Sequence, residues 1–101
     1  MPRKEKVDSS KFYRIFETDE YLKRIQKFSP QDRKFIEKKI NNLVYNQLRS
    51  EPHFGNNIKK LRSYVPEMWR FRIGKYRLFY SIDENDKIVF IITVEFRKDA
   101  Y

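Results

Sequence analysis

The chain has 101 residues and a formal net charge of +9, and it contains no cysteine. This length predicts one self-supporting domain, and the lack of cysteine excludes disulfides, thiolate metal sites and cysteine nucleophiles. The basic excess favours nucleic acid, an acidic protein or an anionic membrane surface as partner. Because the sequence has neither a membrane-length apolar run nor the apolar centre of a signal peptide, we expect no membrane association and a cytoplasmic protein.

The first half of the sequence predicts a tail, a strand and two helices. Residues 1–10 are polar and charged and predict a mobile basic tail ahead of a single domain over residues 11–101. The segment KFYRIFET predicts a short strand, and apolar residues at helical spacing predict a helix over residues 19–28 that follows Thr18-Asp19. Ser29-Pro30-Gln31-Asp32 supplies the N-cap and first turn of a second helix.

The second helix is expected to run to about Arg49 and to bury one apolar stripe against a sheet. The stripe consists of Phe35, Ile36, Ile40, Leu43, Val44 and Leu48. Because the link between the two helices is so short, they should form an antiparallel hairpin that covers one side of the sheet. We interpret both helices as scaffold.

Residues 50–66 contain two prolines, a glycine and two asparagines and predict a loop with at most a short ordered piece. His53, the one histidine of the chain, falls in this loop. With no second histidine, a two-histidine acid/base nuclease and a histidine-cluster metal site are excluded, and a lone loop histidine is usually functionally silent. We expect neither a metal nor a cofactor.

The segment WRFRIGKYRLFY alternates apolar residues with arginines on both sides of Gly74-Lys75. Such alternation predicts a hairpin with one apolar face and one arginine face. A type II′ turn at Gly74-Lys75 places Arg72 opposite Arg77, with Arg70 on the same face. Like charges on neighbouring strands destabilise their pair, so the opposed arginines indicate an anion-binding face. A generic solvated basic face is the alternative.

A second hairpin follows through a turn at residues 83–87. An odd-numbered loop that pairs Ile82 with Ile88 keeps the apolar residues on one buried face. That face comprises Leu78, Tyr80, Ile82, Ile88, Phe90, Ile92 and Val94. The arginine face then receives Val89, Ile91, Thr93, Glu95 and Arg97. Counting along the strand leaves Arg97 about four residues, roughly 13 Å, beyond the row of Arg77.

The pattern KLR, then WRFRIGKYRLFY and a terminal FRKDAY, resembles the RelE/ParE superfamily of toxins from type II toxin–antitoxin systems. The resemblance covers most of the chain. It implies an α+β fold in which an N-terminal strand and a helical hairpin pack on a curved, mostly antiparallel four-stranded sheet. It also implies a small RelB-like antitoxin that covers the basic face.

RelE-like members of the superfamily cleave mRNA in the ribosomal decoding site. Their working residues fall here on Arg70, Arg72, Arg77, Arg97 and Tyr101. RelE itself has lysines at the first two of these positions, and the arginines here cannot act as bases but can still neutralise a phosphate bidentately. The glycine that usually follows KL is replaced by Ser63.

These residues predict a ribosome-dependent mRNA endonuclease that works without metal, by attack of a ribose 2′-OH on the adjacent phosphorus. Arg72 and Arg77 would stabilise the added negative charge. Tyr101 would accept the 2′-OH proton, and Arg97 would orient the phosphate or assist the leaving group. Contacts to mRNA and ribosomal RNA are assigned to Lys59, Lys60, Arg62, Arg70 and Lys75.

Two other functions stay open. The ParE-like branch poisons DNA gyrase without catalysis and has no need of the four residues assigned to the chemistry. A non-catalytic RNA-binding module would use the basic face, with Tyr76, Phe79 or Trp69 for base stacking. For Tyr101, the alternative is a terminal aromatic residue without a role.

Overall fold

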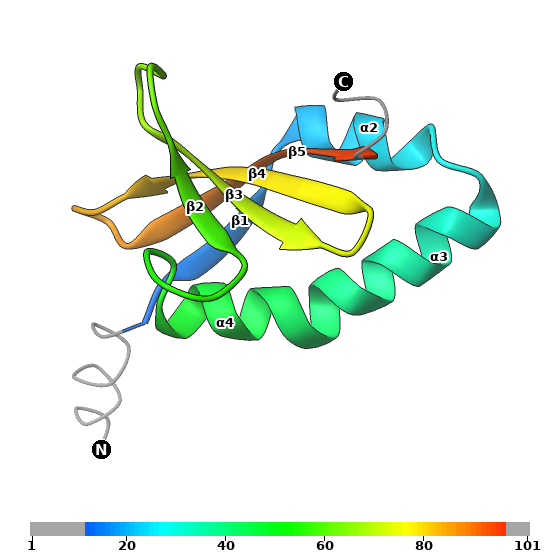
Figure 1. Cartoon of the computed structure of the whole chain (residues 1–101), viewed down its shortest axis with the longest axis horizontal. Coiled ribbons are helices and arrows are strands. Elements are labelled where there is room, and N and C mark those ends of the chain that lie inside the picture. The colour runs from blue at the N-terminus through cyan, green and yellow to red at the C-terminus, as the bar shows by residue number, and fades with distance from the viewer. Residues whose placement is uncertain (1–11, 97–101) are drawn as a thin grey trace.

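The computed structural model describes residues 12–96, which form a five-stranded sheet with α3 and α4 on one face and α2 along the edge at β5 (Figure 1). Along the chain the elements are β1 (Arg14–Glu17), α2 (Asp19–Gln26), α3 (Pro30–Lys39), the π-helical segment η1 (Ile40–Val44), α4 (Tyr45–Ser50), β2 (Ile58–Leu61), β3 (Met68–Ile73), β4 (Tyr76–Asp83) and β5 (Ile88–Phe96). The strand order is β1-β5-β4-β3-β2. The predicted tail, residues 1–10, and two predicted catalytic residues, Arg97 and Tyr101, lie outside the described residues.

The predicted α+β class with a mostly antiparallel sheet is confirmed. β1 runs parallel to β5, and the other neighbouring strands are antiparallel. The strand count differs, because residues 58–61 of the expected loop pair with β3 as the edge strand β2. The chain returns from β2 to β3 through Ser63, which has φ of +67° where the family pattern has glycine. This left-handed conformation is one that glycine adopts at lower cost.

The predicted N-cap at Ser29 is confirmed, and of the two predicted helix-starting residues, Thr18 and Asp19, Thr18 is the N-cap of α2. The hydroxyl of Thr18 accepts a hydrogen bond from the Tyr21 N–H, and that of Ser29 accepts one from the Asp32 N–H. Each bond satisfies one of the backbone N–H groups that the first turn of a helix leaves without a partner. The second helix continues without a break from α3 through η1 to Ser50.

The π-helical segment changes which side of the second helix is buried. The side chains with no exposed surface are Ile36, Ile40, Val44 and Leu48. This four-residue spacing is wider than the 3.6 residues of an α-helical turn, and a wider π turn brings the series back onto one face. Phe35 and Leu43, also expected in the stripe, are instead 53% and 60% exposed.

α2 covers the part of β5 that β1 does not reach. β1 pairs with β5 only as far as Ile91, whose carbonyl accepts hydrogen bonds from the N–H and the hydroxyl of Thr18. Further along, the Nε of Arg24 on α2 donates to the Val94 carbonyl at 2.9 Å. These bonds satisfy the outer edge of β5, which would otherwise be open to another strand.

The β3–β4 hairpin has the predicted register. Ile73 is paired with Tyr76 and Arg72 with Arg77. Gly74 has φ of +57°, the positive value that the first central residue of a type II′ turn requires. Alternate side chains therefore face the helices, and those of β3 and β4 that are buried there are Trp69, Phe71, Ile73, Tyr76, Leu78 and Tyr80.

The predicted register between β4 and β5 is wrong. The turn holds an even number of residues, because Asp83 pairs with Ile88 and Ile82 pairs with Val89. The Asp83 carboxylate accepts the Asp86 N–H within this turn, and Lys87 has φ of +56°. Val89 and Ile91 are consequently buried on the helix side, where Ile88, Phe90 and Ile92 were expected.

A β-bulge restores the pairing further along β5. Tyr80 pairs with Ile91 whereas Phe79 pairs with Thr93, so Ile92 is the extra residue. Beyond the bulge, the alternation has shifted by one residue, and Val94 faces the core as predicted. Bulges thus let an apolar strand keep a buried face despite an even-numbered turn.

Candidate functional site

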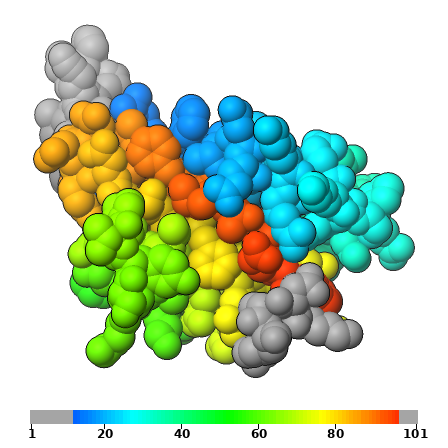
Figure 2. Space-filling view, turned by 90° about the horizontal axis from the view of Figure 1, so that it is seen from above, coloured from blue at the N-terminus to red at the C-terminus, as the bar shows by residue number. Residues whose placement is uncertain are grey.

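The face of the sheet opposite α3 and α4 displays basic residues in two neighbouring rows. One row places Lys59 beside Arg70, and the next places Arg72 beside Arg77. Figure 2 shows this face between the loop that follows β2 and the helix α2. We call Lys59, Arg70, Arg72 and Arg77 the arginine face. The antiparallel register, rather than proximity in sequence, brings these cations together.

Burial increases the electrostatic effect of this face. Arg72 is exposed, whereas Arg70 and Arg77 are partly buried between neighbouring side chains. A partly buried guanidinium is screened less by water and salt than one on a flexible exposed side chain. Guanidinium groups also offer paired N–H donors that match the oxygens of a phosphate. The arrangement is therefore suited to hold a phosphate group.

Glu95 supplies an acidic group to the same region. On β5, Glu95 is the cross-strand partner of Arg77. The predicted register had placed Thr93 opposite Arg77. The guanidinium of Arg24 reaches Glu95 from α2, with 3.4 Å between Nη2 and Oε1. Arg24 was missed because α2 was interpreted as scaffold. One signal could have identified it. Arg24 lies next to Ile25 and four residues before Phe28, at the margin of the apolar stripe of α2.

The other predicted RNA-binding residues lie away from the arginine face. Lys60 is on the Trp69 side of the sheet, where its ammonium forms an ion pair of 2.8 Å with Glu67 and lies 5.7 Å from the Trp69 ring. Arg62 follows β2 and lines a hollow in the β2–β3 loop. Lys75 is exposed in the turn between β3 and β4. The structure therefore brings only part of the predicted basic set together.

The predicted stacking residues divide between the two faces. Phe79 is partly exposed and is the cross-strand partner of Arg70 on the arginine face. Trp69 and Tyr76 are instead buried on the helix side, at 9% and 8% exposure. Of the three predicted stacking residues, Phe79 is therefore the one that an RNA-binding module could use on the arginine face. The proposed placement of Arg97 and Tyr101 beside this face stays a prediction.

His53 lies in a separate charged cluster on the Trp69 side of the sheet. Its Nδ1 lies 2.9 Å from Glu51 and its Nε2 lies 2.6 Å from Glu84. Burial of the ring lowers the pKa of His53, but hydrogen bonds to Glu84 and Glu51 and their charges outweigh this effect, so the pKa is raised. The Tyr13 hydroxyl also donates to Glu84, and burial and this bond raise the pKa of Tyr13 to about 12.

The His53 cluster joins the loop after α4 to the turn between β4 and β5. The His53 ring also contacts Trp69 edge-on, with 5.4 Å between the two ring centroids. These contacts account for His53 without a role at the arginine face. Within residues 12–96, no group of three or more histidine, cysteine or acidic residues is arranged to hold a metal ion. In the same span, no helix has the length and apolar composition needed to cross a membrane.

Comparisons with known proteins agree on the family. The family model described as the ParE toxin of the type II toxin–antitoxin system parDE matches residues 12–101. No curated relative matches the sequence. Among solved structures, the toxin–antitoxin complex RelBE2 from Mycobacterium tuberculosis is similar, with 26% identity and a TM-score of 0.67 over 85% of this chain and 92% of that chain.

Two further structures share the fold. A mutant of the Escherichia coli toxin RelE in the free state has 24% identity and a TM-score of 0.61, over 88% of this chain and 87% of that chain. YoeB from Staphylococcus aureus, solved as a dimer, has 23% identity and a TM-score of 0.63, over 83% and 95%. Because the family model spans nearly the whole chain and includes every described residue, the protein belongs to the RelE/ParE family of toxins from type II toxin–antitoxin systems.

Proposed function

We propose that this toxin is an endonuclease that cleaves mRNA on the ribosome and thereby inhibits translation in the cytoplasm. The observation that carries the proposal is the direct pairing of Arg72 with Arg77 on the open face of the sheet, beside Lys59 and Arg70. A protein that only needed a solvated surface would gain nothing from placing two like charges opposite each other. A phosphate between them turns this repulsion into two charge-assisted contacts.

The chemistry follows from what arginine can and cannot do. Attack of a ribose 2′-OH on the adjacent phosphorus adds negative charge to the non-bridging oxygens. Arg72 and Arg77 stabilise that charge from fixed positions on paired strands, without a proton transfer. Arginine stays protonated, so in this proposal Tyr101, as the tyrosinate, takes the proton of the 2′-OH. The bond from phosphorus to the 5′-oxygen then breaks, which leaves a 2′,3′-cyclic phosphate, and the departing 5′-oxygen takes a proton from water while Arg97 orients the phosphate.

A RelB-like antitoxin is the proposed protein partner. Solved relatives from M. tuberculosis, Pyrococcus horikoshii and E. coli are toxin–antitoxin complexes of the RelBE type. The open face of this chain also carries apolar residues, because Phe16 on β1 pairs with Phe90 on β5 in an aromatic contact of 5.6 Å. A partner with both acidic and apolar side chains suits such a surface.

Inhibition of DNA gyrase is the second candidate, because the matching family model is described as a ParE toxin. Three parallel incubations separate the candidates: the protein with mRNA alone, with mRNA on ribosomes, and with gyrase and plasmid. The proposal expects cuts only on ribosomes, abolished by Arg77→Ala and weakened by Tyr101→Phe. Gyrase poisoning without mRNA cleavage overturns it, and salt-dependent RNA binding without any cut selects the non-catalytic module.

A further inference from the structure

Glu95 brings a negative charge into the row of the sheet that carries Arg72 and Arg77. The three residues lie on adjacent strands, because Arg72 of β3 pairs with Arg77 of β4, and Arg77 pairs with Glu95 of β5. Directly opposed residues of this kind have Cβ atoms about 4.5–5.5 Å apart. A carboxylate repels an incoming phosphate, so a surface that only had to attract RNA would not carry one here. The proposed cleavage reaction gives Glu95 no role.

The β-bulge in β5 turns Glu95 toward the arginine face. Tyr80 pairs with Ile91 before the bulge, and the same register continued without a bulge would place Val94 opposite Arg77. The extra residue shifts the alternation by one position, so Val94 is buried in the core and Glu95 lies opposite Arg77. Bulges are often found beside functional sites, where they redirect a side chain. This bulge exchanges an apolar neighbour of Arg77 for a charged one.

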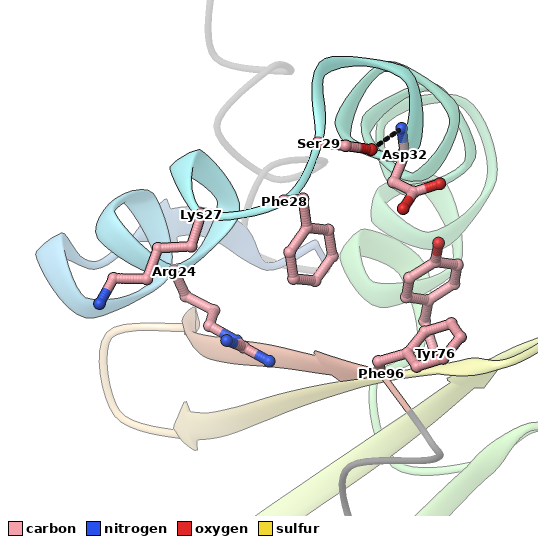
Figure 3. A pocket seen from close by; sticks show the side chains of 7 residues that line it. All are labelled: Arg24, Lys27, Phe28, Ser29, Asp32, Tyr76 and Phe96. Atoms are coloured by element: carbon pink, nitrogen blue, oxygen red, sulfur yellow. Dashed lines mark hydrogen bonds between the residues drawn. The ribbon is translucent and has the colours of Figure 1, made fainter.

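Arg24 holds Glu95 from the edge of the sheet. Figure 3 shows the Arg24 side chain reaching from α2 to β5, in the wall of a pocket of about 280 Å³ that Phe28 also lines. Its Nε donates to the Val94 carbonyl at 2.9 Å, its Nη2 lies 3.4 Å from Oε1 of Glu95, and its Cζ lies 5.2 Å from the centroid of the Phe28 ring. The side chains of Arg24 and Glu95 are only 27% and 35% exposed, so water screens their attraction less than that of a fully exposed pair.

We propose that Glu95 is a positioning residue, which restrains the guanidinium of Arg77 for the phosphate and is itself held by Arg24. Arg72 and Arg77 repel each other across the strands, and this repulsion favours rotation of Arg77 toward solvent. A fixed carboxylate on the other side of Arg77 offsets the repulsion and limits that rotation. Fixed donors accelerate a reaction because they need no reorganisation when charge develops. The role in catalysis rests on the proposed function, whereas the restraint on Arg77 does not.

NMR relaxation of the Arg77 side chain tests the restraint on the full-length protein without any substrate. The order parameter of the Arg77 Nε–H bond should fall in Glu95→Gln, and exchange of this proton with water should become faster, because the carboxylate no longer holds the guanidinium. Glu67→Gln is the control, since it neutralises a carboxylate that pairs with Lys60 on the Trp69 side of the sheet. An Arg77 side chain that is equally ordered in the wild type and in Glu95→Gln overturns the proposal.

Cleavage kinetics on mRNA-programmed ribosomes separate positioning from simple electrostatics. Glu95→Gln removes a negative charge from the face proposed to bind RNA, so charge alone predicts a lower KM and an unchanged or higher kcat. Positioning predicts instead that kcat falls about tenfold while KM does not rise. Glu95→Asp keeps the charge on a shorter side chain and should recover part of the rate. An unchanged kcat in Glu95→Gln contradicts the positioning role.

A double-mutant cycle tests whether Arg24 acts through Glu95. Arg24→Gln should lower kcat in the wild type and have little further effect in Glu95→Gln, because the carboxylate that Arg24 holds is already gone. The lost hydrogen bond to the Val94 carbonyl is common to both backgrounds, and urea unfolding measures its cost. Lys23→Gln makes the same charge change on the exposed neighbouring residue and should leave kcat unchanged. Equal reductions of kcat by Arg24→Gln in both backgrounds contradict the assignment of Arg24.

The NMR and kinetic measurements together distinguish this inference from the proposed function. If the wild type never cuts mRNA but Arg77 loses order in Glu95→Gln, the restraint on Arg77 stands and the nuclease is removed. If the wild type cuts mRNA on ribosomes and Glu95→Gln cuts with the same kcat, the nuclease stands and the positioning role is removed. Loss of order and loss of rate in the same variant, without a rise in KM, support both.

Discussion

The two faces of the β3–β4 hairpin are built from alternate residues of the same strands, yet they differ in almost every physical respect. On the helix side, Ile73 and Leu78 are 8% and 0% exposed and pack into the core. On the open side, Arg72 and Arg77 stand opposite each other. Burial of apolar area supplies stability on one face, and this stability tolerates a destabilising charge pair on the other.

This contrast teaches that stability and function can be altered separately in neighbouring residues. A change on the helix side should lower the free energy of unfolding, and it affects activity only by unfolding the site. A change on the open side should remove activity while the fold persists. Such a division is expected where a sheet has one covered and one uncovered face.

The largest effect is expected from Leu78→Ala. Leu78 has no exposed surface, so its truncation should leave a cavity and lower the free energy of unfolding by about 2–5 kcal/mol. Urea unfolding followed by the fluorescence of the single tryptophan measures this loss. Leu43→Ala is the control, because Leu43 is 60% exposed and should cost less than about 1 kcal/mol. Equal losses in the two variants contradict the assignment of the buried face.

On the opposite face, Arg77→Ala should reduce ribosome-dependent cleavage by about 10²–10³-fold, the usual effect of removing one fixed donor from a developing oxyanion. The free energy of unfolding should change by less than about 1 kcal/mol, because the repulsion from Arg72 is relieved while the attraction to Glu95 is lost. Arg77→Lys should retain part of the rate, because it keeps the charge and loses the paired donors. Lys34→Ala, on the exposed side of α3, is the control for net charge. A parallel loss of stability and activity in Arg77→Ala argues against a separate functional face.

The sequence predicted this hairpin well because two local signals agree there. Strict alternation identifies the buried face, and a glycine at position 74 fixes where the turn falls, so the pairing of Arg72 with Arg77 followed. The helix start at Thr18-Asp19 and the N-cap at Ser29 were predicted for a similar reason, since a capping bond joins residues three apart.

The register of β5 was not predictable in the same way. Residues 88–92 are all apolar, so both an odd and an even turn bury apolar side chains, and patterning cannot choose between them. The bulge at Ile92 depends on the partner strand. The position of Arg24 beside Glu95, 71 residues away, depends likewise on how α2 packs on β5. Long-range packing of this kind leaves little trace in local sequence.

The turn that joins the two faces offers a smaller perturbation of both at once. Gly74→Ala should cost about 1–2 kcal/mol, because φ of +57° is unfavourable for a residue with a Cβ. An added Cβ would meet no atom within 4 Å, so the cost is backbone strain alone. Thermal unfolding measures the cost, and cross-strand NMR contacts between residues 72 and 77 report whether the register survives. If Gly74→Ala stays folded but cleaves mRNA more slowly, the turn positions the arginines.

The smallest expected effect is the pH dependence of stability in His53→Gln, and it distinguishes the two sides of the sheet. Arginines do not titrate near neutrality, whereas His53, on the Trp69 side, does. Both ring nitrogens of His53 can donate to Glu51 and Glu84 only when the ring is protonated. Despite burial, which lowers it, the pKa of His53 is raised above 6.5 by these carboxylates, whereas hydrogen bonds to His53 lower the pKa values of Glu51 and Glu84 below 4.5. The contribution of His53 to the free energy of unfolding is therefore fully present below the pKa of histidine in the unfolded chain. It is lost as the pH rises through the raised pKa of the folded state.

The contributions of Glu51 and Glu84 to the free energy of unfolding are fully present above the pKa of glutamate in the unfolded chain. They are lost as the pH falls through the lowered pKa values of the folded state. The stability difference between the wild type and His53→Gln should therefore be largest at about pH 5.5 and shrink toward about pH 9. Urea unfolding at both pH values measures this difference. Arg77→Ala should show no such pH dependence, since its change in stability comes from a charge that is constant over this range. A difference for His53→Gln that grows with pH would mean that the ring is neutral and that Glu51 and Glu84 hold it by a single bond.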